Sequence, residues 1–227
     1  MSDDAQFSAV EAVIFDLDGV LVDSEQLWDE TRRDLAAGAG RPWPSGATRA
    51  MQGMSTPEWS TYLAATVGIP GSPAELAETV IDAMADRYLA TLPLLPGARE
   101  VVSGLAACWP LGLASSSPRR LIDAVLASAG LADRFAVTIS TEEVSAGKPS
   151  PVVYRTAVQR LGVNPARTVA IEDSTNGLRS AAAAGLTVLA VPHPAFPPLP
   201  AALDLAAVIV DGLSEVTPAL IASLFDQ

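Results

Sequence analysis

Residues 13–21 read Val-Ile-Phe-Asp-Leu-Asp-Gly-Val-Leu, so that a short apolar run stops at two aspartates. The run from Val10 to Phe15 is rich in β-branched and aromatic side chains and ends at Asp and Gly, which predicts a buried β-strand. Asp16 then lies at the carboxyl end of that strand, where open α/β sheets form their ligand crevice. Extended geometry would place Asp16 and Asp18 on the same side of the chain. Two carboxylates that point together repel, so this pair predicts a bound cation, a shared proton or both.

Length and composition limit the classes of protein to which this chain can belong. It has 227 residues, of which 49% are hydrophobic, which is enough for one large domain that carries a smaller insertion and is unlike a disordered chain. The formal net charge of −12 argues against nucleic acid and anionic membrane surfaces as partners. An acidic chain that acts on an anion must gather positive charge locally, from a metal ion or from a few placed basic side chains.

The single cysteine, Cys108, excludes an internal disulfide bond and fits a reducing compartment. It stands between Ala107 and Trp109 in an apolar stretch, which predicts a small core residue rather than a nucleophile. The sequence shows neither a secretory signal nor an apolar run long enough to span a membrane. We therefore expect a cytoplasmic protein that does not bind membranes. The sequence leaves the oligomeric state open, and a monomer is the default expectation.

The segment after the two aspartates shows helical periodicity and no strand pattern. Apolar residues recur near one face from about Ser24 to Ala37. A second helix is predicted from Thr56-Pro57 to about Gly68, and a third from Ser72-Pro73 towards Leu89, because each begins with a capping residue followed by proline. A helical block of this size exceeds an ordinary connection. We assign residues 23–92 to an inserted cap domain, and residues 1–22 and 93–227 to a core domain.

From residue 93 onward, candidate strands and helices alternate along the chain. Such alternation predicts an α/β core, in which a mostly parallel sheet has helices on both faces. The Pro-rich segment Pro192 to Pro200 is predicted to be a surface loop. The candidate strands are Leu111 to Ser115, Phe135 to Ser140, Thr168 to Ile171, Thr187 to Val191 and Ala207 to Val210, and the candidate helices are Ala98 to Cys108, Arg119 to Ala129, Pro151 to Leu161 and Thr175 to Ala184.

Polar side chains follow several of these strands, and the carboxyl ends of parallel strands meet at one edge of a sheet. The strand at Leu111 leads to Ser115 and Ser116, and the strand at Thr168 leads to Glu172 and Asp173. Together with Asp16 and Asp18, the two acidic residues suit a hard cation such as Mg²⁺. The Ser115 hydroxyl and the neighbouring backbone N–H groups suit phosphate oxygens.

Lys148, in Gly147-Lys148-Pro149, is the only lysine of the chain, and every other basic side chain is an arginine. Most sequences of this kind form a solvated turn. A single retained lysine, in a loop that follows a predicted strand and is expected at the same edge of the sheet as the acidic residues, favours a functional role instead. It would supply a compact positive charge beside the carboxylates.

Taken together, four motifs resemble the haloacid dehalogenase superfamily, and most closely its branch of β-phosphoglucomutase-like phosphatases with a helical cap after the first strand. The resemblance covers nearly the whole chain and implies a Rossmann-like core with an all-helical cap. The motifs are Asp16-Leu17-Asp18-Gly19-Val20, Ala114-Ser115-Ser116-Ser117, Gly147-Lys148-Pro149-Ser150-Pro151 and Ile171-Glu172-Asp173-Ser174.

The resemblance also implies a role for each matching residue. Asp16 would attack phosphorus and form an aspartyl-phosphate, and Asp18 would act as general acid and then as general base. Ser115 and Lys148 would hold the phosphoryl oxygens. The implied metal is Mg²⁺, held by Asp16, the backbone carbonyl of Asp18 and Asp173, with Glu172 close by. We further expect substrate contacts from Ser116 and, in the cap, from Trp28, Gln52 and Gly53.

Departures from the family pattern separate the possible activities. Trp28 replaces a histidine associated with β-phosphoglucomutase, and the cap contains no lysine, which argues against a mutase and against a Schiff-base hydrolase. Asp18 argues against a haloacid dehalogenase, and Val152 replaces a family aspartate. We therefore expect a Mg²⁺-dependent phosphatase that acts on a small metabolite, such as a sugar or polyol phosphate. A sugar-phosphate mutase and, in another class, a phospho-acceptor signalling module are the alternatives.

Overall fold

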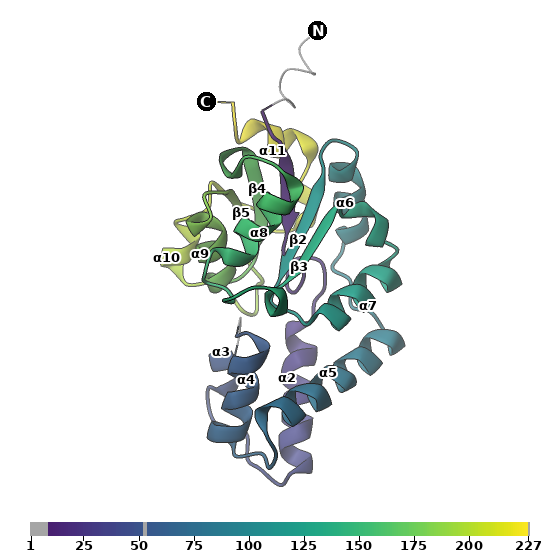
Figure 1. The fold of residues 1–227 in the computed structure, drawn as a ribbon, viewed down its shortest axis with the longest axis vertical. Helices are drawn as coiled ribbons and strands as arrows, with labels where there is room; N and C mark the ends of the chain where they lie inside the picture. The colour runs from purple at the N-terminus through teal and green to yellow at the C-terminus, as the bar shows by residue number, and fades with distance from the viewer. Residues whose placement is uncertain (1–8, 52–53, 227) are drawn as a thin grey trace.

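A parallel six-stranded sheet forms the centre of the computed structural model, which describes residues 9–51 and 54–226. Its strand order is β3-β2-β1-β4-β5-β6, so the strand that leads to Asp16 lies in the interior of the sheet (Figure 1). Each neighbouring pair is parallel, which confirms the predicted α/β core. The strands are β1 (Ala12–Phe15), β2 (Leu111–Ser115), β3 (Val137–Ser140), β4 (Thr168–Glu172), β5 (Thr187–Ala190) and β6 (Val208–Ile209).

Helices cover both faces of this sheet because alternate residues of the central strand point in opposite directions. Val13 and Phe15 belong to an apolar cluster that includes residues of α6 (Ala98–Ala106), α7 (Arg119–Ala129) and α11 (Pro218–Ser223). Ile14 belongs to a second cluster on the other face. That cluster includes residues of α8 (Val152–Leu161), α9 (Thr175–Ala183) and α10 (Pro200–Leu203).

The remaining α-helices and one π-helical turn lie together beyond the carboxyl edge of the sheet, in the lower part of Figure 1. They are α2 (Glu25–Gly38), α3 (Ala47–Met51), α4 (Thr56–Tyr62), the π-helical turn η1 (Leu63–Val67) and α5 (Pro73–Ala90). Capping boxes start two of them: the backbone N–H of Ser55 donates to Glu58 at 2.7 Å, and that of Ser72 to Glu75 at 2.8 Å. Ser72 is the predicted cap, whereas the cap of α4 is Ser55, one residue before the predicted Thr56. The assignment of residues 23–92 to a separate cap domain remains a prediction.

Two neighbouring backbone segments connect these helices to the sheet. Val22 and Leu94 form an antiparallel bridge, and the N–H of Asp23 donates to the carbonyl of Pro93 at 2.8 Å. The N–H of Leu95 donates to the carbonyl of Leu21 at 3.0 Å. The chain therefore leaves the core and returns to it through one paired junction.

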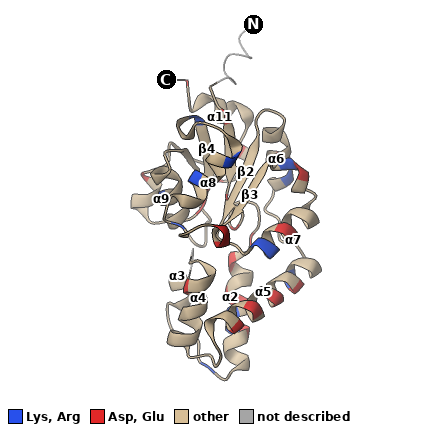
Figure 2. Cartoon of the chain, in the orientation of Figure 1, with Lys and Arg blue, Asp and Glu red and all other residues tan. Residues whose placement is uncertain are grey.

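A second contact between the two parts joins α5 to α7. Figure 2 shows acidic positions along α5, and Arg120 of α7 lies 2.8 Å from Asp82 and 3.7 Å from Glu78. All three side chains are at least half exposed. Such surface ion pairs contribute about 0–1 kcal/mol each, so these two ion pairs add little to the contact between the helices.

The prediction that Cys108 is a core residue is wrong, because its side chain is exposed. Helical spacing points Val102 and Leu105 inward, Trp109 is also buried, and Cys108 takes the outward position between them. In residues 9–51 and 54–226, no helix combines the length and the hydropathy that crossing a bilayer requires.

Candidate active site

The site lies where three neighbouring strands end. β1 pairs with β2 on one side and with β4 on the other, and Phe15 is in register with both Leu113 and Ile171. The N–H of Asp16 donates to the carbonyl of Ile171 at 3.0 Å, which fixes the start of the loop after β1. The predicted convergence of the acidic strand ends is therefore present.

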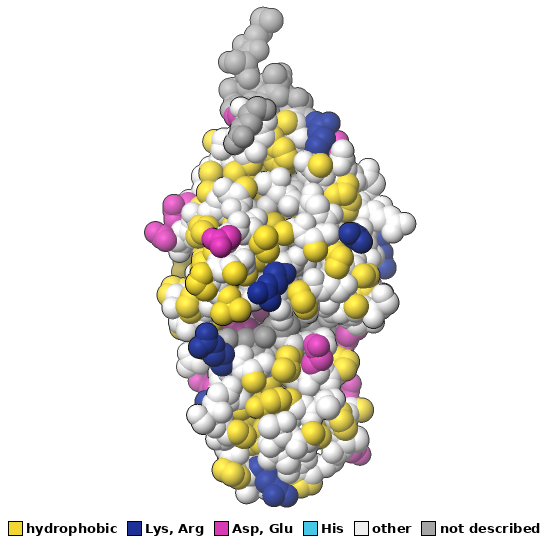
Figure 3. Space-filling model, turned by 90° about the vertical axis from the view of Figure 1, so that its left-hand side faces the viewer, with side chains coloured by type: hydrophobic (Ala, Val, Ile, Leu, Met, Phe, Trp, Pro, Cys, Tyr) yellow, Lys and Arg dark blue, Asp and Glu magenta, His cyan; other side chains and the backbone are white. Residues whose placement is uncertain are grey.

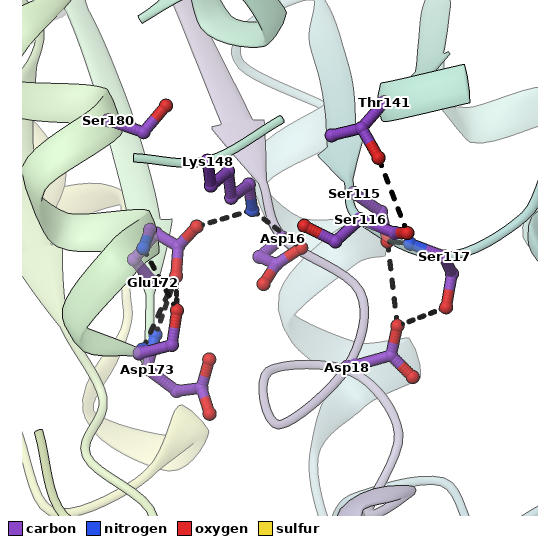
Figure 4. A network of polar contacts seen from close by, with 12 residues as sticks. Asp16, Asp18, Ser115, Ser116, Ser117, Thr141, Lys148, Glu172, Asp173 and Ser180 are labelled. Carbon is purple, nitrogen blue, oxygen red and sulfur yellow. Dashed lines mark hydrogen bonds and ion pairs between the residues drawn. The ribbon is translucent and has the colours of Figure 1, made fainter. Parts of the chain in front are cut away.

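Lys148 is buried between two of the predicted carboxylates (Figure 4). Its Nζ atom lies 2.9 Å from Oδ1 of Asp16 and donates to Oε1 of Glu172 at 2.6 Å. The exposed fraction is 5% for Lys148, 6% for Asp16 and 0% for Glu172, so these charges interact with little screening by solvent. The retained lysine is thus a buried ion-pair partner rather than a solvated turn residue.

Glu172 is held on all sides by donors. The hydroxyl of Tyr154 donates to the same Oε1 atom at 2.7 Å, and the backbone N–H groups of Asp173 and Ser174 donate to Oε2 at 3.2 and 3.4 Å. Gly177 makes room for this carboxylate, since a β-carbon there would lie 1.9 Å from Oε2. Glu172 therefore acts mainly to position Lys148 and the start of α9.

Burial and neighbouring charge shift the pKa values of this cluster. Burial, followed by the charge of Glu172, raises the pKa of Asp16 to about 8. The same two causes raise the pKa of Asp173 well above its usual value. Burial alone would lower the pKa of Lys148, but the charges of Asp16 and Glu172 raise it above its usual range. The protein itself therefore supplies too little positive charge to balance these buried carboxylates.

The acidic cluster fits a divalent metal ion. One carboxylate oxygen from each of Asp16, Glu172 and Asp173 lies within 4.8 Å of the others. Oδ1 of Asp173 is buried and has no hydrogen-bond partner among the residues that the structure describes. A cation would satisfy this atom and offset the charge that Lys148 leaves unbalanced. Carboxylate oxygens are the ligands that Mg²⁺ takes in proteins, so the donor set agrees with the predicted cofactor.

Asp18 makes contacts with different partners from those of Asp16 (Figure 4). Its Oδ1 accepts hydrogen bonds from Ser24 Oγ at 2.5 Å and from Trp28 Nε1 at 3.4 Å. Its Oδ2 accepts from Ser117 Oγ at 2.5 Å. The Asp18 carboxylate is therefore outside the group of three carboxylates described above, and its side chain is oriented by the loop after β2 and by the N-terminal end of α2.

The predicted phosphate-binding serines occupy different positions. Ser115 is fully buried, and its Oγ accepts a hydrogen bond from the N–H of Ser117 at 2.9 Å and lies 3.5 Å from Oδ2 of Asp18. Ser116 and Ser117, rather than Ser115, line the pocket. Ser115 therefore shapes the loop after β2 and presents its two neighbours to the pocket.

A pocket of about 350 Å³ lies between the core and the helices beyond the sheet edge. Asp16, Asp18, Lys148 and Asp173 line it on the core side, and Trp28 lines it from α2. The predicted contact of Trp28 with the substrate stays a prediction. Figure 3 shows that the molecule narrows between its upper and lower parts, with basic side chains nearby. The exposed arginines of the pocket lining are Arg49 and Arg179. The predicted contacts Gln52 and Gly53 lie outside the described residues. Further lining residues are Glu25, Arg32, Met51, Met54, Trp59, Asn176 and Phe196.

Two residues of the site, Tyr154 and Arg32, were not predicted from the sequence. Tyr154 belongs to a helix pattern in which a buried tyrosine has an ordinary packing role, so only the contact with Glu172 distinguishes it. Arg32 stands beside Arg33 in a polar run that is typical of a solvated helix face. Its spacing of four residues from Trp28 is the one signal that places it on the buried side.

Comparison with known proteins agrees with this geometry. The profile of a family described as haloacid dehalogenase-like hydrolase matches residues 10–185. Hexitol phosphatase B of Escherichia coli is 37% identical over 193 residues, which cover 81% of this chain and 84% of that protein. A phosphorylated carbohydrates phosphatase of Thermotoga maritima is 33% identical over 78% of this chain and 82% of its own. The fold matches a β-phosphoglucomutase from Clostridium difficile with a TM-score of 0.82 at 22% identity, covering 96% and 97% of the two chains.

Proposed function

Because this chain belongs to the haloacid dehalogenase-like hydrolase family, we propose that it is a phosphatase that hydrolyses a small sugar or polyol phosphate. One observation carries the proposal: Asp16, Lys148 and Asp173 meet at the core end of a pocket large enough for a small metabolite. The names of the two similar phosphatases support the substrate class.

In the first step a carboxylate oxygen of Asp16 attacks phosphorus, and the bond between phosphorus and the leaving oxygen breaks. Asp18 gives its proton to that oxygen, so the product leaves as an alcohol. Lys148 is close enough to Asp16 to orient the nucleophile and to offset charge on the phosphoryl oxygens. Ser116 and Ser117 line the pocket where those oxygens would lie.

In the second step water attacks the phosphorus of the aspartyl-phosphate and gives its proton to Asp18. The bond between phosphorus and the Asp16 oxygen breaks, which releases inorganic phosphate and restores both residues. Hydrogen bonds from Ser24 and Ser117 hold Asp18 in place for both proton transfers.

Mg²⁺ would be held by Asp16 and Asp173, with the Asp18 carbonyl as an expected ligand and Glu172 close by, and would neutralise developing charge on the phosphoryl group. The buried, unpartnered Oδ1 of Asp173 supports this assignment.

Hydrolysis of p-nitrophenyl phosphate with and without Mg²⁺ tests the proposal. We expect turnover that requires Mg²⁺ and that is lost in Asp16→Asn. Mass spectrometry of rapidly quenched protein should detect a phosphorylated Asp16. An inactive wild-type protein, or an Asp16→Asn variant that is as fast as wild type, would show the proposal to be wrong.

A sugar-phosphate mutase is the second candidate. The missing cap lysine argued against it, but Arg32 and Arg49 bring basic groups to the wall of the pocket. Isomerisation of a hexose phosphate, primed with a hexose bisphosphate, distinguishes a mutase from a phosphatase. A long-lived phospho-Asp16 without turnover would identify the third alternative, a phospho-acceptor module.

A further inference from the structure

Arg32 is a buried cation in the pocket wall that the reaction described above does not use. It is 7% exposed, and it lines the pocket from α2. Its Cζ atom lies 4.9 Å from the ring centroid of Trp28 and 5.1 Å from that of Trp59. Its Nε atom is buried without a hydrogen-bond partner among the described residues. Since buried polar groups nearly always have partners, the free N–H of this guanidinium is available to donate a hydrogen bond to a ligand in the pocket.

The surroundings of Arg32 are acidic rather than basic. Asp18, Glu25 and Asp29 lie close enough for their charges to act on it. Burial lowers the pKa of Arg32 to about 10, so the side chain remains charged near neutral pH. A second phosphate group placed here would meet the carboxylates of Asp18 and Glu25 as well as the guanidinium. Among the pocket arginines, Arg49 and Arg179 at the exposed rim are better placed for such an anion.

Glu25 complements Arg32 within the same pocket. The two residues are seven positions apart on α2, which places them on one helix face. Burial, followed by the charge of Asp18, raises the pKa of Glu25 to about 7. The wall therefore offers a donor that cannot accept and, beside it, a carboxyl group that accepts. A hydroxyl group both donates and accepts, so it matches this pair better than an anion does.

The two indole rings add a matching apolar surface. Trp28 and Trp59 are buried, and their ring centroids lie 5.9 Å apart with an angle of 55° between the planes. Pockets for small molecules combine such aromatic surface with a few placed polar groups, which set orientation and specificity. A carbon chain that bears hydroxyl groups presents both kinds of surface.

We propose that Arg32, supported by Trp28 and Trp59 and complemented by Glu25, determines specificity by binding the hydroxyl groups of a monophosphorylated sugar or polyol. This inference rests on the proposed phosphatase function and assigns the substrate's unphosphorylated end to a named residue.

Arg32→Met tests the inference because it keeps an apolar side chain against the rings and removes the donors. We compare kcat/KM for glucitol phosphate, which has a hydroxyl-bearing chain, with kcat/KM for p-nitrophenyl phosphate, which has none. The expected loss for glucitol phosphate is about 10- to 100-fold, mostly through KM, as is typical for a removed charged hydrogen bond. The loss for p-nitrophenyl phosphate is expected to be several-fold smaller, so the ratio between the two substrates falls.

Arg33→Met is the matched control. Arg33 is the next residue on α2, its side chain is 47% exposed, and it pairs with Asp29 outside the pocket. We expect this variant to keep the wild-type ratio. Arg32→Lys, which keeps the charge and loses the planar donor pair, should show an intermediate ratio and replaces Arg32→Met if thermal melting shows that variant to be unfolded.

Two results would overturn the inference. Equal losses for both substrates in a folded Arg32 variant would assign Arg32 a structural role. A larger loss for a ketose bisphosphate than for glucitol phosphate would mean that Arg32 binds a second anion. A wild-type protein that hydrolyses neither substrate would instead contradict the proposed function itself.

Discussion

Gly19 lies directly against the carboxylate of Asp173: a β-carbon at position 19 would be 2.0 Å from Oδ2 of Asp173. The backbone of Gly19 also has a φ of +78°, in the region that glycine adopts most readily. The glycine that follows the two aspartates therefore allows the loop after β1 to approach the acidic end of β4.

Replacing Gly19 with Ala should displace Asp173 and weaken Mg²⁺ binding. We expect the Mg²⁺ concentration for half-maximal phosphatase activity to rise at least about tenfold, as for losses around a metal ligand. Gly130→Ala is the control, because Gly130 has a φ of +67° but nothing within 4 Å of the added carbon. That control should lose about 1–2 kcal/mol of unfolding free energy and keep its Mg²⁺ dependence. Equal Mg²⁺ dependence in both variants would contradict the packing argument.

Removing the charge of Glu172 should destabilise the core. Among the described residues, Glu172→Gln leaves the buried Lys148 with only Asp16 as an ion-pair partner, and an amide cannot accept from all the donors that surround the carboxylate. The expected loss is about 3–5 kcal/mol in the free energy of unfolding, measured with urea. Tyr154→Phe removes a single donor to the same oxygen and should lose only about 1 kcal/mol. The explanation fails if the two variants lose the same amount.

Stability without metal should fall as the pH rises. The pKa of Asp16 is about 8 in the folded protein and about 3.9 in an unfolded chain, so between these values the folded state binds the extra proton. The contribution of this group is therefore complete at low pH and is lost as the pH approaches 8. Mg²⁺ needs the deprotonated carboxylate, so its effect should grow over the same range.

Thermal melting with EDTA or with Mg²⁺, at about pH 5.5 and about pH 8, measures this effect. We expect the rise in Tm on adding Mg²⁺ to be larger at the higher pH. Asp173→Asn should remove most of that rise, because it removes a proposed ligand. A Mg²⁺ effect that is independent of pH would refute the prediction.

Ser117 should act through Asp18. Its hydroxyl donates to Oδ2 of Asp18 at 2.5 Å, so Ser117→Ala leaves the proposed acid and base less well oriented. We expect kcat to fall by roughly tenfold, which corresponds to about 1.4 kcal/mol. In an Asp18→Asn background the same change should have little further effect, since the two residues act as one unit. Additive losses in the double variant would mean that Ser117 works independently, for example on the substrate.

The sequence was sufficient to predict the elements whose local signals agree with their surroundings. β2 and α7 have the predicted bounds, because a buried apolar run and a strong helical repeat leave no competing interpretation. Helix α3 was not predicted, since five residues are too few to show a period. The predicted helix from Thr56 changes to a π-helical turn at Leu63, which the pattern of apolar residues does not distinguish from α-helix.

The convergence of Asp16, Glu172 and Asp173 was predictable because parallel strands end together, and Lys148 was expected to join them from the loop after the predicted strand that ends at Ser140. The different contacts of the serines were not predictable. Whether Ser115 or Ser117 faces the pocket depends on the loop after β2, and Ser115 caps the loop backbone instead. Arg32 escaped prediction because one of its partners, Trp59, lies on α4 and meets it only once α2 and α4 pack together.

The paired junction at Val22 and Leu94 allows the helices between these residues to be exchanged as one segment. An insertion that enters and leaves the core at adjacent points does not disturb the register of any strand. The helices from α2 to α5 can therefore vary separately from the sheet edge except at Ser24 and Trp28, whose side chains donate to Asp18. A chimaera that exchanges the helices between these two positions and retains Ser24 and Trp28 should keep the residues at the sheet edge in place while acquiring a new substrate preference.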